Sequence, residues 1–185
     1  MQTKIIQKGS VLIARPTLLT DVFHRSVVLL TDHSPNNGSI GFVLNKPLTH
    51  TVNDFLQDIN SNAIVYEGGP VDQENIFYIH KRPDLISESE KITENLFWSG
   101  HFDDVKHALN NGYINDDEIR FYLGYSGWAS EQLQTEIENN AWNINNELNF
   151  DFFDKWKVNL WKEQMKNLGG ENLIWFNMPD NPMLN

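Results

Sequence analysis

A series of short, β-branched apolar runs between Ser10 and Trp128 is the feature that most constrains how this chain can fold. In chain order the runs read SVLIA, SVVLLTDH, SIGFVLNK, AIVYEGGPV, NIFYIHK, NLFWSG and EIRFYLGYSGW. Runs of this length, rich in valine, isoleucine and aromatic residues and bounded by turn residues, predict strands. Helix-like segments fall between some of them without a regular strand-helix-strand period. The pattern therefore favours an α+β fold with a mixed, largely antiparallel sheet over a doubly wound parallel sheet.

Turn and capping signals predict how these elements connect. Asn36, Asn37 and Gly38 predict a hairpin whose second strand ends at Pro47. The glycine-proline turn in AIVYEGGPV predicts a second hairpin-like unit over residues 63–81.

Capping patterns and helical periodicity predict the helices. Thr51 and Asp54 form a capping-box pattern, and Ser99 is expected to cap a helix that ends at Gly112. The segment SEQLQTEIENN predicts a helix after an elbow at the end of EIRFYLGYSGW. An apolar stripe predicts the last helix, and it comprises Phe153, Trp156, Leu160, Trp161, Met165 and Leu168. We expect one domain over residues 1–185, with residues 171–185 as a C-terminal tail docked on its surface.

Composition narrows the class of protein. The chain has 185 residues, of which 40% are hydrophobic, so one core can bury most of its apolar surface. It contains no cysteine, which excludes disulfides and thiolate nucleophiles. No apolar run is long enough to span a bilayer, and the start MQTKIIQKGS does not resemble a signal peptide. We therefore expect a cytoplasmic protein.

The segment Gly124-Tyr125-Ser126-Gly127-Trp128 invites comparison with the nucleophile elbow of hydrolases, because its serine follows a strand and precedes a helix. That elbow requires a glycine two residues after the serine, where this chain has Trp128. We therefore interpret Gly124 and Gly127 as residues that permit a tight turn. Tyr125 and Trp128 are expected to pack against the following helix.

Histidines do not indicate a metal site or a catalytic set. No two of them are spaced four residues apart on one predicted helix, and they are His24, His33, His50, His80, His101 and His107. Asp21, His24, Arg25 and Ser26 lie close together and could place a histidine beside a serine. The alternative is a loop in which Asp21 and Arg25 pair or satisfy backbone groups. We predict no catalytic residue, no metal and no other cofactor.

Two polar turns are candidate binding elements. In Glu67-Gly68-Gly69-Pro70, adjacent glycines expose backbone N–H groups that can meet an anion, although a plain turn explains the same residues. Asn45-Lys46-Pro47 could line the same cleft or could terminate a strand.

Four ordered segments resemble the bacterial AlgH/YqgE family. They are GSVLIARPTL and DVFHRSVVLLTDH within 9–33, GSIGFVLNKP in 38–47, EGGPV in 67–71, and FYLGYSGWASEQLQTEIENNAW in 121–142. The segment LWKEQMKNLGG in 160–170 is similar to the family's closing helix. The resemblance implies an α+β fold with a small, barrel-like, bifurcated sheet surrounded by helices, and it implies no established enzyme activity. The family's functional label, a transcriptional regulator of alginate production, rests on genetic association.

The family motifs supply the candidates for a cleft or binding surface. These residues are Asp21, Arg25, Asn45, Lys46, Pro47, Glu67, Gly68, Gly69, Pro70, Gly124, Tyr125, Gly127 and Trp128.

Three functional hypotheses follow from the sequence and the resemblance. The first is a non-enzymatic regulatory protein that acts through an unidentified protein partner. The second is a small-molecule-binding protein or an unrecognised hydrolase with a cleft near Asn45, Glu67 and Trp128. The third is a regulator that binds DNA directly. A formal net charge of −11 without a visible basic cluster disfavours that third hypothesis, because affinity for nucleic acid rests largely on Lys and Arg.

Overall fold

The computed structural model describes residues 5–18, 22–147, 150, 152–153 and 159–176. Its strands are β1 (Val11–Ala14), β2 (Val27–Ser34), β3 (Gly38–Val43), β4 (Pro47–Thr51), β5 (Ile64–Glu67), β6 (Val71–His80), β7 (Glu90–Thr93), β8 (Leu96–Trp98), β9 (Ile119–Trp128) and β10 (Trp142–Asn145). Its helices are α1 (Val52–Phe55), α2 (Phe102–Asn110), α3 (Gln132–Glu138), α4 (Leu160–Leu168) and α5 (Asn172–Phe176). The predicted α+β class is confirmed. Within the described ranges, no helix is long and apolar enough to cross a lipid bilayer.

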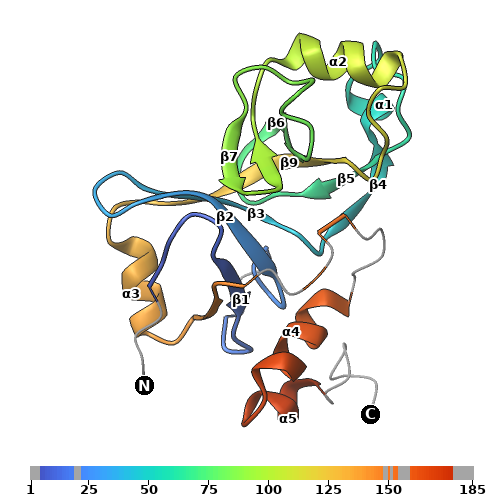
Figure 1. The fold of residues 1–185 in the computed structure, drawn as a ribbon. Coiled ribbons are helices and arrows are strands. Elements are labelled where there is room, and N and C mark those ends of the chain that lie inside the picture. Colours follow the sequence, from blue (N-terminus) through green and yellow to red (C-terminus); the bar gives the residue numbers. More distant parts are fainter. Residues whose placement is uncertain (1–4, 19–21, 148–149, 151, 154–158, 177–185) are drawn as a thin grey trace.

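Most strands form one mixed sheet in the order β10-β1-β2-β3-β9-β6-β8-β7 (Figure 1). Neighbours in this order pair antiparallel, including the predicted hairpin of β2 and β3. β5 adds a parallel pairing with β9 and an antiparallel pairing with β4. The prediction of a mixed, largely antiparallel sheet is therefore confirmed.

The sheet divides along β9, the strand that its two parts share. The C-terminal residues Ser126–Trp128 pair with β3, whereas Phe121–Leu123 pair with β5 on one edge and β6 on the other. The predicted hairpin-like unit over residues 63–81 is therefore wrong, because β5 and β6 flank β9 instead of pairing with each other. The glycine-proline turn between them carries the chain across β9 and reverses its direction without pairing the two strands.

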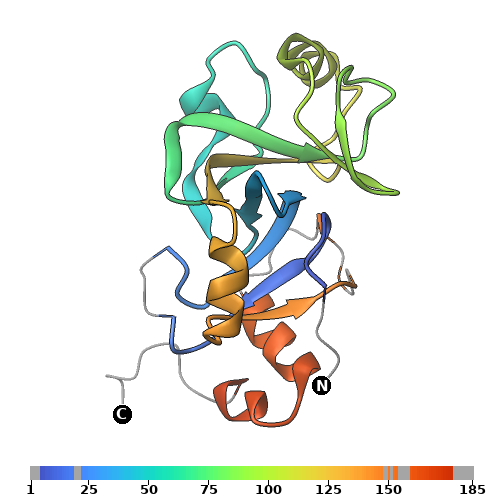
Figure 2. The same cartoon turned by 90° about the vertical axis from the view of Figure 1, so that its left-hand side faces the viewer.

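Burial on both faces explains why the strand runs are continuously apolar. In β1, Val11 and Ile13 join a cluster that α4 covers, while Leu12 and Ala14 join a second cluster that includes Leu133 of α3. A third cluster packs α1 and α2 against the other part of the sheet. In both views, α1 and α2 lie at one end of the molecule, and α4 and α5 lie at the other (Figure 1, Figure 2).

The predicted elbow is wrong, because β9 continues as a strand through Trp128. β3 pairs antiparallel with β9 as far as Trp128, and this pairing keeps the chain extended beyond Gly124. α3 then begins at Gln132, after a short connection in which Glu131 has a positive φ of 63°. A strand-turn-helix geometry that would expose the Ser126 hydroxyl is therefore not formed.

Other element boundaries also differ from the prediction. The capping box of Thr51 and Asp54 is present, but the helix that it starts is a single turn. Pro47 begins β4, and the hairpin strand ends earlier, at Val43. The N-cap residue of α2 is His101 and not Ser99.

The last predicted helix is shorter than its apolar stripe suggests. α4 begins at Leu160, Phe153 is buried in a turn before it, and Trp156 lies outside the described residues. In the predicted tail, residues 172–176 form α5, and Trp175 packs partly against the cluster under α4. Residues 177–185 lie outside the described part of the chain.

A carboxylate of α3 accepts hydrogen bonds from two tryptophan rings of the sheet and so fixes α3 against it. Glu136 Oε2 accepts hydrogen bonds from the indole Nε1 of Trp128 at 2.9 Å and of Trp142 at 2.8 Å. The Trp128 and Trp142 rings meet edge to face, and Phe23 contacts both. Trp128 therefore packs against α3 as the sequence predicts.

Replacing Glu136 by alanine should lower the free energy of unfolding by about 2–4 kcal/mol, because two largely buried indole N–H groups lose their acceptor. Chemical denaturation followed by tryptophan fluorescence measures the change. Glu138→Ala removes an exposed carboxylate from the same helix and should change stability by less than about 0.5 kcal/mol. Equal losses in the two variants would contradict this role for Glu136.

Candidate functional site

The glycines of the EGGPV motif form the point where the chain crosses β9. A Cβ atom on Gly68 would lie 2.1 Å from the carbonyl oxygen of Gly124, and one on Gly69 would lie 2.3 Å from the backbone of Tyr125. Gly68 donates its N–H to the Leu123 carbonyl and accepts the N–H of Val43, both at 2.9 Å. These glycines therefore make the close backbone contact at which the sheet divides.

The serine of the family motif is part of the same crossing. Ser126 is fully buried, and its Oγ donates a hydrogen bond to the Gly68 carbonyl at 3.0 Å. The sequence suggests no partner for this hydroxyl, and the structure gives it one. Its role is to satisfy a buried carbonyl, not to attack a substrate.

Asn45 holds the loop between β1 and β2. Its Oδ1 accepts the Val27 N–H at 2.8 Å, and its Nδ2 donates to the Arg25 carbonyl at 2.9 Å. Arg25 itself has a positive φ of 51°, and its guanidinium lies 5.3 Å from the centre of the Trp161 ring. These two candidates therefore support the fold on the side of the sheet that α4 covers.

Some of the remaining sequence candidates make backbone hydrogen bonds, and others lie on the surface. The backbone N–H of Glu67 donates to the Lys46 carbonyl at 2.9 Å, while Pro47 and Pro70 are exposed. Asp21 lies outside the described residues.

The β9 candidates open onto a surface hollow. Tyr125 packs edge to face on Phe77 of β6 and not on α3, contrary to the prediction. Together with Gly127 and Trp128 it lines this hollow beside the β2-β3 hairpin. Asn45 and Glu67 lie elsewhere, at the glycine crossing and its flanks.

A buried histidine lies beside a serine, the two side-chain types of a possible catalytic pair. His80 Nε2 lies 3.1 Å from Ser89 Oγ, but that hydroxyl donates to the Ile86 carbonyl at 2.6 Å. His80 Nδ1 accepts the Arg82 N–H at 3.1 Å, so the hydrogen-bond network assigns the ring proton to Nε2. With this tautomer His80 cannot take a proton from Ser89, and the pair is structural.

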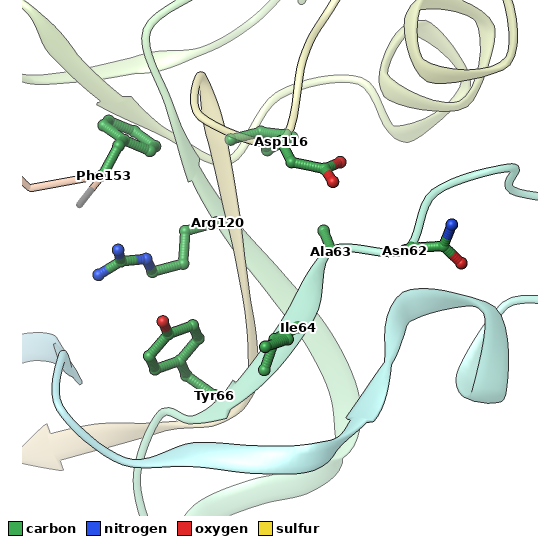
Figure 3. A pocket seen from close by; sticks show the side chains of 8 residues that line it. Asn62, Ala63, Ile64, Tyr66, Asp116, Arg120 and Phe153 are labelled. Carbon is green, nitrogen blue, oxygen red and sulfur yellow. The ribbon is translucent and has the colours of Figure 1, made fainter. Parts of the chain in front are cut away.

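The pocket in Figure 3 brings together groups that no sequence motif joins. It is a cavity of about 150 Å³ lined by Asn62, Ala63, Ile64, Tyr66, Asp116, Ile119, Arg120 and Phe153. Arg120 is 8% exposed, and its guanidinium lies 4.6 Å from the centre of the Tyr66 ring and 5.1 Å from that of Phe152. An almost fully buried cation that stacks on aromatic rings is the feature that most distinguishes this pocket.

A buried hydroxyl lies behind the wall of this pocket. Tyr122 is two residues after Arg120 on the same face of β9, and its ring centre lies 6.1 Å from that of Tyr66. Burial raises the pKa of the Tyr122 hydroxyl, and the positive charge of Arg120 opposes part of that rise. Arg120 is also within hydrogen-bonding reach of this hydroxyl. The Arg120 guanidinium and the Tyr122 hydroxyl therefore place two polar groups on this side of the sheet.

A second concave surface is an apolar groove between the β2-β3 hairpin and α3, with a volume of about 420 Å³. Its lining comprises Ile5, Ile6, His33, Ser34, Pro35, Asn36, Gly38, Ser39, Ala129, Glu131, Leu133 and Gln134. Ile5 is 73% exposed on its rim, whereas Leu133 is buried at its floor. His33 Nδ1 and Ser39 Oγ lie 2.8 Å apart, and Ser130 Oγ donates to the Pro35 carbonyl at 2.7 Å. These bonds hold the hairpin close to the start of α3.

Arg120 and Tyr66 are not among the residues that the motifs single out. A signal for Arg120 was present, because a charged side chain interrupts the apolar run Ile119–Leu123 in a strand buried on both faces. Tyr66 gave no such signal, since tyrosine is ordinary in a strand. Among the described residues, no cluster of three or more histidine and carboxylate side chains could hold a metal ion.

The chain is similar to known proteins over nearly its whole length. The model of the AlgH-like family (DUF179) matches residues 11–173. A UPF0301 protein of Cytophaga hutchinsonii is 35% identical over 98% of this chain and 100% of its own length. A UPF0301 protein of Bacteroides thetaiotaomicron is 38% identical over 96% of this chain and 91% of its own length.

Two solved structures show the same fold. The crystal structure of protein DIP2367 from Corynebacterium diphtheriae has a TM-score of 0.79 at 21% identity, with 96% of this chain and 95% of that one covered. The solution structure of the AlgH protein from Pseudomonas aeruginosa has a TM-score of 0.73 at 23% identity, with 98% of this chain and 99% of that one covered.

Proposed function

The chain belongs to the AlgH-like family, and we propose that it is a non-enzymatic regulatory protein that acts through a protein partner. The partner docks an apolar segment with flanking basic residues into the groove between the β2-β3 hairpin and α3. The groove carries this proposal, because it combines an open apolar surface with walls from two segments that resemble the family.

The construction of the groove supports a docking role. One wall contains Ala129, Glu131 and Leu133, which lie within the 121–142 segment that resembles the family. The opposite wall is the β2-β3 hairpin, whose residues His33, Gly38 and Ser39 lie within the 9–33 and 38–47 segments that resemble the family. Its rim residue Ile5 is 73% exposed, and burying such a side chain against a partner contributes about 1.5–3 kcal/mol. An apolar groove of this kind fits a peptide segment.

Charge defines the chemistry of the partner. The chain has a formal net charge of −11, and Glu131, Glu136 and Glu138 of the α3 segment are acidic without a basic residue among them. Basic residues flanking the docked segment would therefore be attracted, and their contribution would be sensitive to salt. A regulatory effect on transcription would pass through this partner, because the same charge repels DNA.

The test compares two exposed isoleucines at separate sites. Ile5 lies on the groove, and Ile174 of α5 is 65% exposed away from it. Affinity purification of the natively expressed chain should recover one stoichiometric, basic partner, which is then purified for binding measurements. Ile5→Asp should weaken that complex at least tenfold, and Ile174→Asp should leave it unchanged.

Two results would contradict this proposal. One is equal weakening by the two aspartate variants, which would place the contact elsewhere. The other is saturable retention of duplex DNA by the chain alone at low ionic strength, which would favour direct DNA binding instead.

A further inference from the structure

The hollow beside the β2-β3 hairpin is open because Gly127 has no side chain. A Cβ atom on Gly127 would lie 3.2 Å from the Tyr125 ring and 3.7 Å from the Val71 side chain. A larger residue at this position would fill the space between those two side chains. The hollow has a volume of about 360 Å³, and Gly127 is exposed within it. It can therefore take one long side chain from another molecule.

One carboxylate gives this hollow its charge. Asp32 is exposed and lines the hollow together with Ile40, its partner across the strand pair. A β-bulge between Leu30 and Asp32 sets this register, and opposed residues of an antiparallel pair lie on the same face of the sheet. Within the described ranges no side chain forms an ion pair with Asp32, and none of the lining residues is basic. The hollow therefore attracts a cation.

An aromatic ring in the same hollow selects the kind of cation. Tyr125 is half-buried, and its ring packs edge to face on Phe77 with 5.5 Å between the ring centres, which fixes its orientation. A guanidinium group stacks on an aromatic ring through its face and binds a carboxylate through two parallel N–H groups. An ammonium group is a point charge and makes no such paired contact. Tyr125 and Asp32 together therefore favour arginine over lysine.

The hollow and the groove lie on the two sides of one hairpin. Gly38 and Ser39 line both of them. Leu133 on the groove and Ile40 in the hollow pack into hydrophobic clusters on opposite faces of the sheet. A segment that fills the groove can therefore reach the hollow where it crosses the hairpin.

We infer that the hollow receives an arginine side chain from the partner segment that docks in the groove. Its guanidinium stacks on Tyr125 and forms a bidentate pair with Asp32. This inference rests on the proposed function, and it specifies which flanking basic residue the partner needs. Apolar contacts in the groove hold the segment, and the arginine fixes its register along the hairpin.

Titration of the isotope-labelled full-length chain with Nα-acetyl-arginine-N-methylamide, followed by NMR, tests the hollow without the partner. The probe should bind saturably with a Kd of about 10 mM or below and shift the amide signals of Gly127 and Asp32. The citrulline analogue has a similar shape without the charge and should bind at least fivefold more weakly. Because the probe has no apolar segment, this result is independent of whether Ile5→Asp weakens the partner complex.

Two exposed aspartates provide a matched pair of variants. Asp117 lies outside the hollow, and each change to asparagine removes one negative charge from the surface, so both variants should fold as the parent does. Asp32→Asn should weaken binding of the arginine probe at least fivefold and weaken the purified partner complex by a similar factor. Asp117→Asn should change neither.

The inference about the hollow can fail separately from the groove. Absence of saturable binding by the arginine probe, or the same response in the two asparagine variants, would overturn it. A partner complex that is weakened by Ile5→Asp and not by Asp32→Asn would also overturn it, and would leave the groove as the docking site.

Discussion

Gly68→Ala should lower the free energy of unfolding by at least about 3 kcal/mol, and it will prevent folding if the chain has only ordinary stability. The added Cβ would lie 2.1 Å from the Gly124 carbonyl oxygen and 3.0 Å from the rings or side chains of Phe42 and Tyr122. Backbone at this crossing cannot move without breaking the hydrogen bonds of Gly68 to Val43 and Leu123. Urea denaturation measures the loss, or the soluble yield reports it when the variant does not fold.

Gly127→Ala is the matched control, because Gly127, like Gly68, is a glycine in one of the segments that resemble the family. Its added Cβ would meet the Tyr125 ring at 3.2 Å, and a side chain can turn away where backbone cannot. We expect a change within about 1 kcal/mol, because an alanine in a strand also restricts the unfolded chain. A similar loss in both variants would show that the crossing is not the constraint described.

Acidification should destabilise the protein through His80, by about 3 kcal/mol in total. Burial lowers the pKa of this histidine to about 4, and the Ser99 hydrogen bond and the Asp84 charge offset only part of that effect. An unfolded histidine has a pKa near 6.5, so between about pH 6.5 and pH 4 the unfolded state binds more protons than the folded state. Stability therefore falls as the pH decreases through this window, and it does not change further through His80 below it.

Denaturation midpoints measured from pH 7 to pH 4 test this dependence. His80→Asn places an amide oxygen near the position of Nδ1, where it can accept the Arg82 N–H, and it removes the titration. The variant should be less stable at pH 7, with a flatter dependence on pH. His24→Asn, at an exposed histidine, should keep the parent's slope, and an unchanged slope in His80→Asn would contradict the assignment.

Local sequence signals predicted β1, β2, β3, β5, β6, β8, β9 and the first hairpin, because those signals act over short distances, but they did not predict β4, β7 or β10. Strand runs such as Val11–Ala14 are apolar on both faces, and Gly38 marks the tight turn, so neither depends on the rest of the chain. The exchange of partners along β9 was not predictable in this way. It depends on Gly68 meeting Gly124, which are far apart in sequence, and paired glycines alone are equally typical of a plain turn.

The candidate sites also differ in whether local sequence signals or contacts between distant residues determine them. Motif residues such as Asn45 and Ser126 suggested a cleft. In the structure both side chains bind buried backbone groups, a role that calls for the same kinds of residue. Arg120 was detectable as a charge within an apolar strand, although its aromatic neighbours come from β5 and from residues 152–153. Side chains brought together by the tertiary fold leave no common spacing in the sequence.

The groove and the proposed partner form the central claim, and site-specific photo-crosslinking tests it most directly. A photoreactive residue at Gln134, on the groove, is compared with one at exposed Gln57, which lies beside α1 and away from it. In native cells, position 134 should crosslink to one apolar segment with flanking Lys or Arg residues in a single protein, and position 57 should not. Crosslinks of that protein to position 57 alone, or no stoichiometric product at position 134, would contradict the account.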